Sequence, residues 1–371
     1  MQSEPEPQQP PAPSPPTLPT LTALSADLQA SLERWAPVAV EGVDPSLHYL
    51  PPHVSKTHWD ELGNAVSSRE KGCAGSVSGE RWISLRLDGS GFSAAVRTMR
   101  KLGVLEPQGF SERFASAMVV CTRGLMEKFG GVLGFTQSDE MIVFIPPASI
   151  VRGEQQCHTR SGRCTKITTL AAGYVTARFI VELSKMVLES GGDLDGLSQV
   201  LPHFDCRMGD WDSWEEASAL LLWRGHDCCT NGVSDAVHHS GMTGKKQAIG
   251  FGTREKVAWL HGHSMLPLPA HQAYGTVLVK VKRRVQGSDP RKPEEVTVAL
   301  RSRIEQVHGP VLELARTCGF FPGSDVLSEA EREEIAAAEG ERKAKKKKNN
   351  NPAERAEAAA AAAEARGNPG A

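Results

Sequence analysis

The sequence WISLRLD at residues 82–88 lies at the centre of the predicted fold. Its residues alternate in polarity and include aromatic and β-branched side chains, which is typical of a strand. The run Gly89-Ser90-Gly91 follows at once and ends the strand, because glycine favours turns. The stretch therefore predicts a strand that carries Asp88 to the edge of a sheet.

Three further elements follow this strand along the chain. Residues 110–129 have apolar side chains at spacings of three and four, which predicts an amphipathic helix that ends at Gly130. The apolar runs 132–136 and 141–145 enclose a polar turn and predict a β-hairpin. A second helix is expected after Arg163. We expect its buried side to hold Ile167, Leu170, Ala171, Tyr174 and Val181.

The composition is that of an ordinary globular chain. The 371 residues include 42 basic and 44 acidic side chains, so the chain is nearly neutral. No apolar run approaches the ~20 residues that span a bilayer. The N-terminus lacks the basic and apolar regions of a targeting segment. We therefore expect a protein that does not enter a membrane and that is cytoplasmic, with the nucleus and the mitochondrion as alternative locations.

The eight cysteines are spread along the chain and do not form a disulfide framework. Two clusters, at 157–164 and 228–239, combine cysteine with histidine. Neither has the paired Cys-x-x-Cys spacing of a structural zinc site. Reduced and mostly buried thiols are therefore favoured over zinc.

Shifts in composition divide the chain into five segments. Residues 1–20 form a proline-rich tail that cannot bury enough apolar surface to fold, and residues 322–371 form a charged tail rich in alanine and lysine. Residues 21–80 are an N-terminal extension to which we assign no role. Residues 81–200 hold the elements above, and residues 201–321 form the C-terminal part of the fold.

Two acidic residues are expected to meet at one edge of this sheet. Asp88 ends the first strand, and Asp139 lies in the turn of the hairpin that would pair beside it. Magnesium prefers hard oxygen ligands, and two such ions can activate a hydroxyl and neutralise phosphate charge. The turn Gly89–Phe92 could present main-chain N–H groups to a triphosphate. This arrangement would suit a two-metal nucleotidyltransferase, although Asp-Gly after a strand is more often an ordinary turn and an acidic hairpin tip is more often only solvated.

Six short motifs, taken together, resemble the tRNA-His guanylyltransferase family. The first two are the Asp-Gly-x-x-Phe motif at 88–92 and the Gln-Ser-Asp-Glu motif at 137–140. The third, Arg-x-x-Lys, lies at 163–166. The others, in chain order, are Phe-Asp-x-Arg at 204–207, Trp-Arg-x-x-Asp-Cys-x-x-Asn at 223–231 and Gly-Thr-Val-Leu at 275–278.

The resemblance implies a fold and a reaction. The fold is a polymerase-like palm, a ferredoxin-like antiparallel sheet with helices on one face, followed by a helical and β extension. The reaction adds guanosine from GTP to the 5′ end of tRNA-His, in the 3′-to-5′ direction, after ATP has activated that end. Two magnesium ions, a tRNA partner and a homotetramer are also implied.

The resemblance assigns roles to residues by position. Asp88, Asp139 and the carbonyl of Gly89 would bind the metal ions, and Glu140 would support catalysis. The nucleotide would contact Gly89, Ser90, Gly91, Phe92, Ser138, Arg163 and Lys166. The tRNA would contact Arg224, Asn231, Lys280 and Lys282. The basic alternation at the last two also predicts a phosphate-binding face by itself, with a solvated edge strand as the alternative.

Several positions depart from the family pattern. The histidine, second asparagine and tyrosine that follow Asp-Cys in eukaryotic members are absent from residues 229–234. Glu106 stands where the family has a lysine, Gly162 where it has an arginine, and Ser93 where it has a histidine. These changes weaken the prediction of strict tRNA-His selection.

Two alternative functions remain open. Loss of recognition contacts would relax specificity, which favours a polymerase that repairs the 5′ ends of tRNAs. A non-catalytic RNA-binding scaffold would explain the altered residues, but the intact Asp88 and Asp139 oppose it, since paired carboxylates are costly without a metal. A cyclase-like enzyme is disfavoured by the motifs after Lys166.

Overall fold

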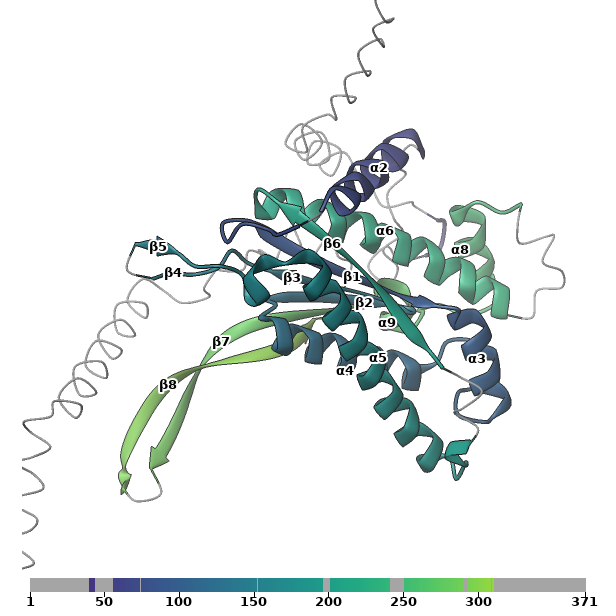
Figure 1. Ribbon diagram of the computed structural model, residues 1–371. Helices are drawn as coiled ribbons and strands as arrows, with labels where there is room; N and C mark the ends of the chain where they lie inside the picture. The colour runs from purple at the N-terminus through teal and green to yellow at the C-terminus, as the bar shows by residue number, and fades with distance from the viewer. Residues whose placement is uncertain are drawn as a thin grey trace, which may run out of the picture. The chain divides into compact units, whose positions relative to one another are not determined.

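A computed structural model describes most of the chain between the two predicted tails (Figure 1). The described residues are 40–43, 56–73, 75–151, 153–195, 201–240, 250–289, 292–307 and 309. The segments 1–20 and 322–371 lie outside them. Among the described residues, no helix is long and apolar enough to cross a membrane.

The central part of the sheet has ferredoxin-like topology. Four of its strands lie in the order β6-β1-β3-β2, and each is antiparallel to its neighbour. The element order along the chain is strand, helix, hairpin, helix, strand, as a ferredoxin-like unit requires. These elements are β1 (Trp82–Ser90), α4 (Glu112–Phe129), β2 (Leu133–Gln137), β3 (Glu140–Ile145), α5 (Cys164–Glu189) and β6 (His203–Trp211). The predicted α+β class and antiparallel sheet are confirmed.

The first face of the sheet is covered by α4 and α5. Side chains alternate between the faces of a strand, so Ile83, Leu85 and Leu87 of β1 all point into this side of the core. Helix α4 begins at an N-cap, Ser111, whose side chain accepts a hydrogen bond from the Phe114 N–H. The helix ends at Gly130, which has the left-handed conformation that favours glycine.

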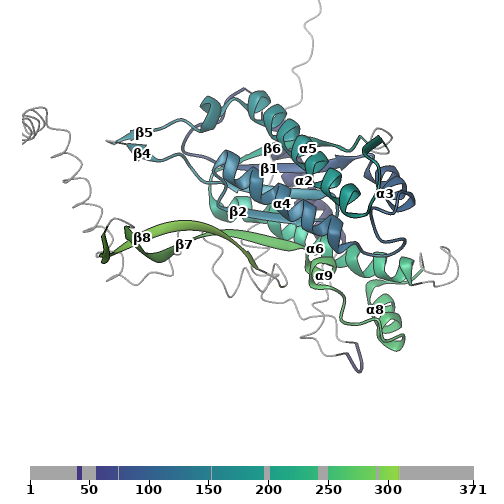
Figure 2. The same ribbon diagram turned by 90° about the horizontal axis from the view of Figure 1, so that it is seen from below.

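The second face of the sheet is also covered, by α2 (Lys56–Gly72) and α6 (Trp214–His239). Figure 2 shows α5 and α6 on opposite sides of the sheet. The prediction placed helices on one face only and therefore missed the layer formed by α2 and α6. The reason lies in β3, whose residues 140–145 are buried on both faces. A strand of this kind must be covered on both sides.

Helix α5 buries a different stripe from the one predicted. Ile167 and Ala171 face the core as expected, but Leu170 and Val181 are exposed. The buried positions continue at intervals of three or four residues through Val175, Phe179, Leu183 and Met186. The predicted stripe was therefore partly wrong, because it combined residues from two sides of the helix.

The remaining elements extend this core. Helix α8 (Thr253–Gly262) and helix α9 (Ala270–Tyr274) pack with the end of α6 in a small apolar cluster. Strand β7 pairs with β2 through residues 276–279, and β8 follows it in the sheet. Residues 281–303 belong to a second compact unit. The elements not yet given are α3 (Phe92–Lys101), β4 (Ile150–Val151), β5 (Glu154–Gln155), the 3-10 helix η1 (Thr159–Gly162), β7 (Thr276–Asp289) and β8 (Lys292–Val307).

Candidate active site

One row of polar side chains crosses four strands at the end of β1. Asp88 is paired with Glu140 of β3 on one side and with Asp205 of β6 on the other. Glu140 is in turn paired with Gln137 of β2. Directly paired residues point to the same face of a sheet. The row therefore concentrates carboxylates on the face that α2 and α6 cover.

The β2–β3 turn brings Asp139 to the same end of the sheet. The main-chain N–H of Gly89 donates a hydrogen bond to the Asp139 carbonyl at 3.1 Å. Ser138, the other turn residue, has φ of 45°, which is uncommon for a residue with a side chain. Its hydroxyl donates to the Asp139 carboxylate at 3.1 Å. The sequence-predicted pair Asp88 and Asp139 is thus brought together by a main-chain hydrogen bond.

The electrostatics of Asp139 suit a cation. Burial raises the pKa of Asp139, hydrogen bonds from Ser138 and its own main chain act to lower it, and the Asp88 carboxylate adds to the increase. A bound dication would relieve the repulsion between these two carboxylates. Within the described ranges, no three His, Cys, Asp or Glu side chains form a metal-binding group. Two carboxylates with a main-chain carbonyl, as at Gly89, are the kind of partial shell that magnesium completes with phosphates and water.

The turn after Asp88 depends on glycine and on a buried aromatic ring. A Cβ atom on Gly89 would lie 2.4 Å from the Phe92 ring, and Gly91 has φ of 70° at the N-cap of α3. Ser90 is exposed beside them. Phe92, which was predicted to contact nucleotide, is buried, and its ring packs against Phe114, Phe179 and Phe204. Its contacts in the structure anchor the turn to the core.

Glu140 and Arg224 contact each other. The Arg224 guanidinium donates to the Glu140 carboxylate from Nε at 2.7 Å and from Nη2 at 2.6 Å. Arg224 also pairs with Asp227 at 3.0 Å. Asn231, one turn further along α6, donates to Asp227 at 3.1 Å. Two residues predicted to bind tRNA, Arg224 and Asn231, therefore already have protein partners.

A buried ion pair beside Asp88 was missed by the sequence reasoning. Arg86 lies two residues before Asp88 in β1 and donates to Glu70 of α2 at 2.7 Å, with both side chains about 5% exposed or less. Burial acts to lower the pKa of Arg86, but Glu70, Glu140 and Asp88 outweigh it and raise the pKa. Arg86 is therefore a fixed cation close to the acidic row. The available signal was the alternation of the strand, which places the charged residue Arg86 on the same face as Asp88.

The basic residues predicted to hold phosphates lie at the start of α5. Arg163 is the N-cap of this helix and Lys166 is in its first turn, and both are exposed. Lys280 is exposed on β7, and the side chain of Lys282 lies outside the described residues. The positive end of a long helix dipole favours anions at this place.

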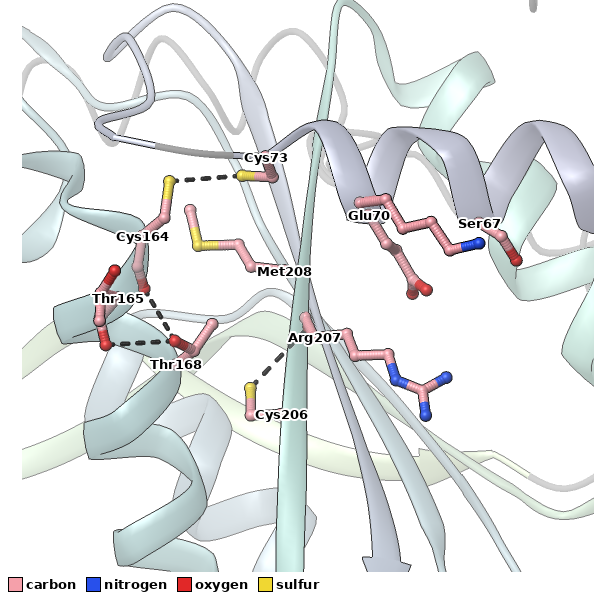
Figure 3. Close-up of a pocket in the computed structure, with 10 residues that line it drawn as sticks. Ser67, Glu70, Cys73, Cys164, Thr165, Thr168, Cys206, Arg207 and Met208 are labelled. Atoms are coloured by element: carbon pink, nitrogen blue, oxygen red, sulfur yellow. Dashed lines mark hydrogen bonds between the residues drawn. The ribbon is translucent and has the colours of Figure 1, made fainter.

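A pocket of about 360 Å³ adjoins the start of α5 (Figure 3). It is bounded by the first turn of α5, by α2 and by residues 206–208 of β6, which pair opposite residues 85–87 of β1. The pocket thus begins one residue beyond the acidic row. Cys73 and Cys164 meet at its wall with their sulfur atoms 3.4 Å apart. Neither predicted Cys/His cluster forms a metal-binding group among the described residues.

Comparison with known protein families gives a match over part of the chain. The family model described as tRNAHis guanylyltransferase matches residues 66–210, which run from α2 to the end of β6. An uncharacterised protein of Acanthamoeba polyphaga mimivirus is 26% identical over 227 residues, which cover 55% of this chain and 72% of that protein.

Solved structures of this group also align with the chain. A bacterial tRNA(His) guanylyltransferase-like protein in complex with ATP is 17% identical, with a TM-score of 0.49, over 70% of this chain and 97% of the other. The tRNA(His) guanylyltransferase of Saccharomyces cerevisiae is 18% identical, with a TM-score of 0.45, over 63% of this chain and 95% of the other.

Proposed function

Because residues 66–210 belong to the tRNAHis guanylyltransferase family, we propose that this chain is a magnesium-dependent nucleotidyltransferase that adds guanosine from GTP to the 5′ end of tRNA-His. The observation that carries the proposal is the hydrogen bond from the Gly89 N–H to the Asp139 carbonyl. It joins the end of β1 to the hairpin turn, so that the carboxylates of Asp88 and Asp139 share one edge of the sheet.

The reaction requires activation of the tRNA 5′ end before addition. The 5′ monophosphate attacks ATP and becomes adenylylated, with release of pyrophosphate. The 3′-hydroxyl of GTP then attacks the activated phosphate and displaces AMP, and pyrophosphate is later removed from the new end. When bound, magnesium activates the attacking hydroxyl and neutralises phosphate charge.

The protein's own residues would position the reactants. Asp88, Asp139 and the Gly89 carbonyl would hold the ions, and the N–H groups that start α3 would face the triphosphate. Arg163 and Lys166 supply positive charge at the start of α5, where a guanidinium can hold two phosphate oxygens at once. Arg86, which is held by Glu70, would supply a fixed positive charge beside the carboxylate row.

The test is incorporation of α-labelled GTP into 5′-monophosphorylated tRNA-His, with ATP and magnesium. We expect Asp139→Asn to lower incorporation by at least about 100-fold, because it removes a charged ligand from a metal that lowers the barrier by several kcal/mol. Asp235→Asn is the matched control, since Asp235 is an exposed residue of α6 that pairs with His239. Equal activity of Asp139→Asn and wild type would contradict the assignment.

Repair of truncated tRNA 5′ ends is the second candidate. The observation that favours it is the bond from Asn231 to Asp227, which engages the one asparagine retained from the family's recognition motif. Tight selection of tRNA-His is harder without free recognition groups. A parallel assay with a tRNA lacking its first 5′ nucleotide separates the two, and faster extension of that RNA supports repair. No labelling of any tRNA by folded protein supports a non-catalytic scaffold.

A further inference from the structure

The Ser138–Asp139 turn is held at both ends by one residue of α6. Glu140, which follows the turn, accepts hydrogen bonds from the Arg224 guanidinium at 2.7 and 2.6 Å. Gln137, which precedes the turn, donates from its side-chain amide to the Arg224 carbonyl at 3.3 Å. Arg224 lies 84 residues from Glu140 along the chain. The attachment is therefore tertiary and independent of the hairpin's own ladder.

The geometry of the Arg224–Glu140 ion pair fixes the orientation of the Glu140 carboxylate. Arg224 meets the carboxylate with two nitrogen atoms, and the side chains of Arg224 and Glu140 are 16% and 7% exposed. A bidentate pair of this kind fixes orientation as well as distance. Because little water reaches it, solvent screens the attraction less than in a surface pair. A lysine has the same charge but lacks the planar fork.

The turn needs such support because its backbone is strained. Ser138 has φ of 45°, and uncommon backbone conformations persist only where surrounding contacts determine them. Inside the hairpin, the Thr136 hydroxyl donates to the Glu140 carbonyl at 2.9 Å. The contacts to Arg224 add restraint from outside the hairpin. Together they fix the residues on either side of Asp139.

Arg224 is itself held in place. Its guanidinium lies 4.9 Å from the centre of the Trp223 ring and pairs with Asp227 at 3.0 Å. The same ring lies 5.8 Å from the Arg86 guanidinium, which is bound to Glu70. A cation over an indole face is attracted to it. These contacts hold the Arg224 side chain in one position on α6.

We propose that Arg224 is a positioning residue that clamps the Gln137–Glu140 turn and so presents Asp139 to Asp88 for metal binding. Glu140 acts through Arg224, because both of its oxygen atoms are engaged there. The inference rests on the proposed metal site. It gives Arg224 a role other than the tRNA contact that the resemblance implies, and it specifies how Glu140 would support the site.

The test measures Mn²⁺ binding by calorimetry in the absence of RNA, together with amide hydrogen exchange across residues 133–145. We expect Arg224→Lys and Glu140→Gln each to weaken Mn²⁺ binding by about 10–100-fold, the usual effect of losing a partner that orients a metal ligand. Both should also speed exchange in the turn. Glu140→Gln is close in shape to the native side chain, so it remains informative if the arginine variant folds poorly.

The controls separate the clamp from other roles. Arg178→Lys makes the same change in a pair on α5 whose arginine is 41% exposed, and should alter neither reading. Asp139→Asn should abolish Mn²⁺ binding without faster exchange in the flanking strands. If Arg224→Lys keeps the Mn²⁺ affinity and the exchange rates of the wild type, the proposal is overturned. Weaker tRNA binding by that variant would then support the expectation that Arg224 contacts tRNA.

One outcome distinguishes the clamp from the metal site itself. If the wild-type protein binds no Mn²⁺, the proposed function fails. The exchange data alone then test whether Arg224 clamps the turn. Faster exchange at 133–145 in Arg224→Lys, with the rest of the chain unchanged, would still support it. Unchanged exchange would overturn it.

Discussion

The buried pair between Glu70 and Arg86 makes a prediction about the N-terminal extension. Glu70 is the only charged partner within hydrogen-bonding distance of Arg86 among the described residues, and their side chains are 4% and 5% exposed. The change Glu70→Gln keeps the shape and one acceptor but removes the negative charge. The buried guanidinium of Arg86 then loses its bonded counter-ion, while helix α2 keeps its apolar contacts with the sheet.

The magnitude follows from burial. Removal of one partner from a buried ion pair costs about 3–5 kcal/mol, because the remaining charge is desolvated without compensation. Glu140 and Asp88 also attract Arg86, so we expect the lower end, about 3 kcal/mol. The matched control is Glu189→Gln, whose carboxylate is 67% exposed and pairs with Arg113. An exposed pair of this kind contributes less than about 1 kcal/mol.

The assay is urea unfolding at neutral pH, with the free energy of unfolding extrapolated to water for each variant. The double change Glu70→Gln with Arg86→Met should recover part of the loss, since it removes both buried charges. A loss in Glu70→Gln no larger than that in Glu189→Gln would refute the reasoning. It would mean that the extension is not fastened to β1 by this pair.

Three further predictions concern other sites. Gly89→Ala would place a methyl group 2.4 Å from a neighbouring aromatic ring, so we expect a loss of about 1–3 kcal/mol in thermal unfolding, and wild-type stability would contradict the packing. Cys73 and Cys164, with sulfur atoms 3.4 Å apart, should be linked by a small disulfide oxidant. Peptide mass mapping checks this against Cys73→Ser, and two free thiols after treatment would count against the contact. Burial lowers the pKa of His158, although its hydrogen bond to the Arg81 carbonyl acts to raise it. His158 therefore stabilises the fold most at pH values above the ordinary histidine pKa of about 6.5. This stabilisation is lost as the pH falls below that value towards the lowered pKa of the folded state. His158→Gln should reduce the fall in melting temperature between about pH 8 and pH 5. The same fall in the variant and the wild type would show that His158 does not cause this pH dependence.

The parts of the fold that were predictable are those with local signals. The strand at 82–88 and the hairpin around residues 137–140 follow from alternation and turn residues, and the structure confirms both. Their pairing also followed, because a strand, helix and hairpin in this order have few ways to form one sheet. The meeting of Asp88 with Asp139 could therefore be inferred before the structure.

The parts that were missed depend on contacts between distant segments. Helix α2 was left as an extension without a role, because its amphipathic pattern does not indicate what it covers. The run at 141–145 is apolar at every position, which is typical of a strand covered on both faces, and this signal was not used. The partners Glu140 and Arg224 belong to different elements, so their charges could not be paired from spacing. Motif resemblance identified both residues but could not give their contact.

The cover that α6 provides for β3 has a consequence for chain growth. Synthesis proceeds from the N-terminus, so a nascent chain completes both aspartates and all of β6 before α6 leaves the ribosome. Until then, Ile142 and Phe144, which pack against α6 residues in the finished protein, have no cover from that helix. A fragment that ends at residue 210, where the family match ends, would keep this state permanently. Such a fragment should self-associate through the uncovered strands, and the minimal unit for expression therefore extends to at least His239.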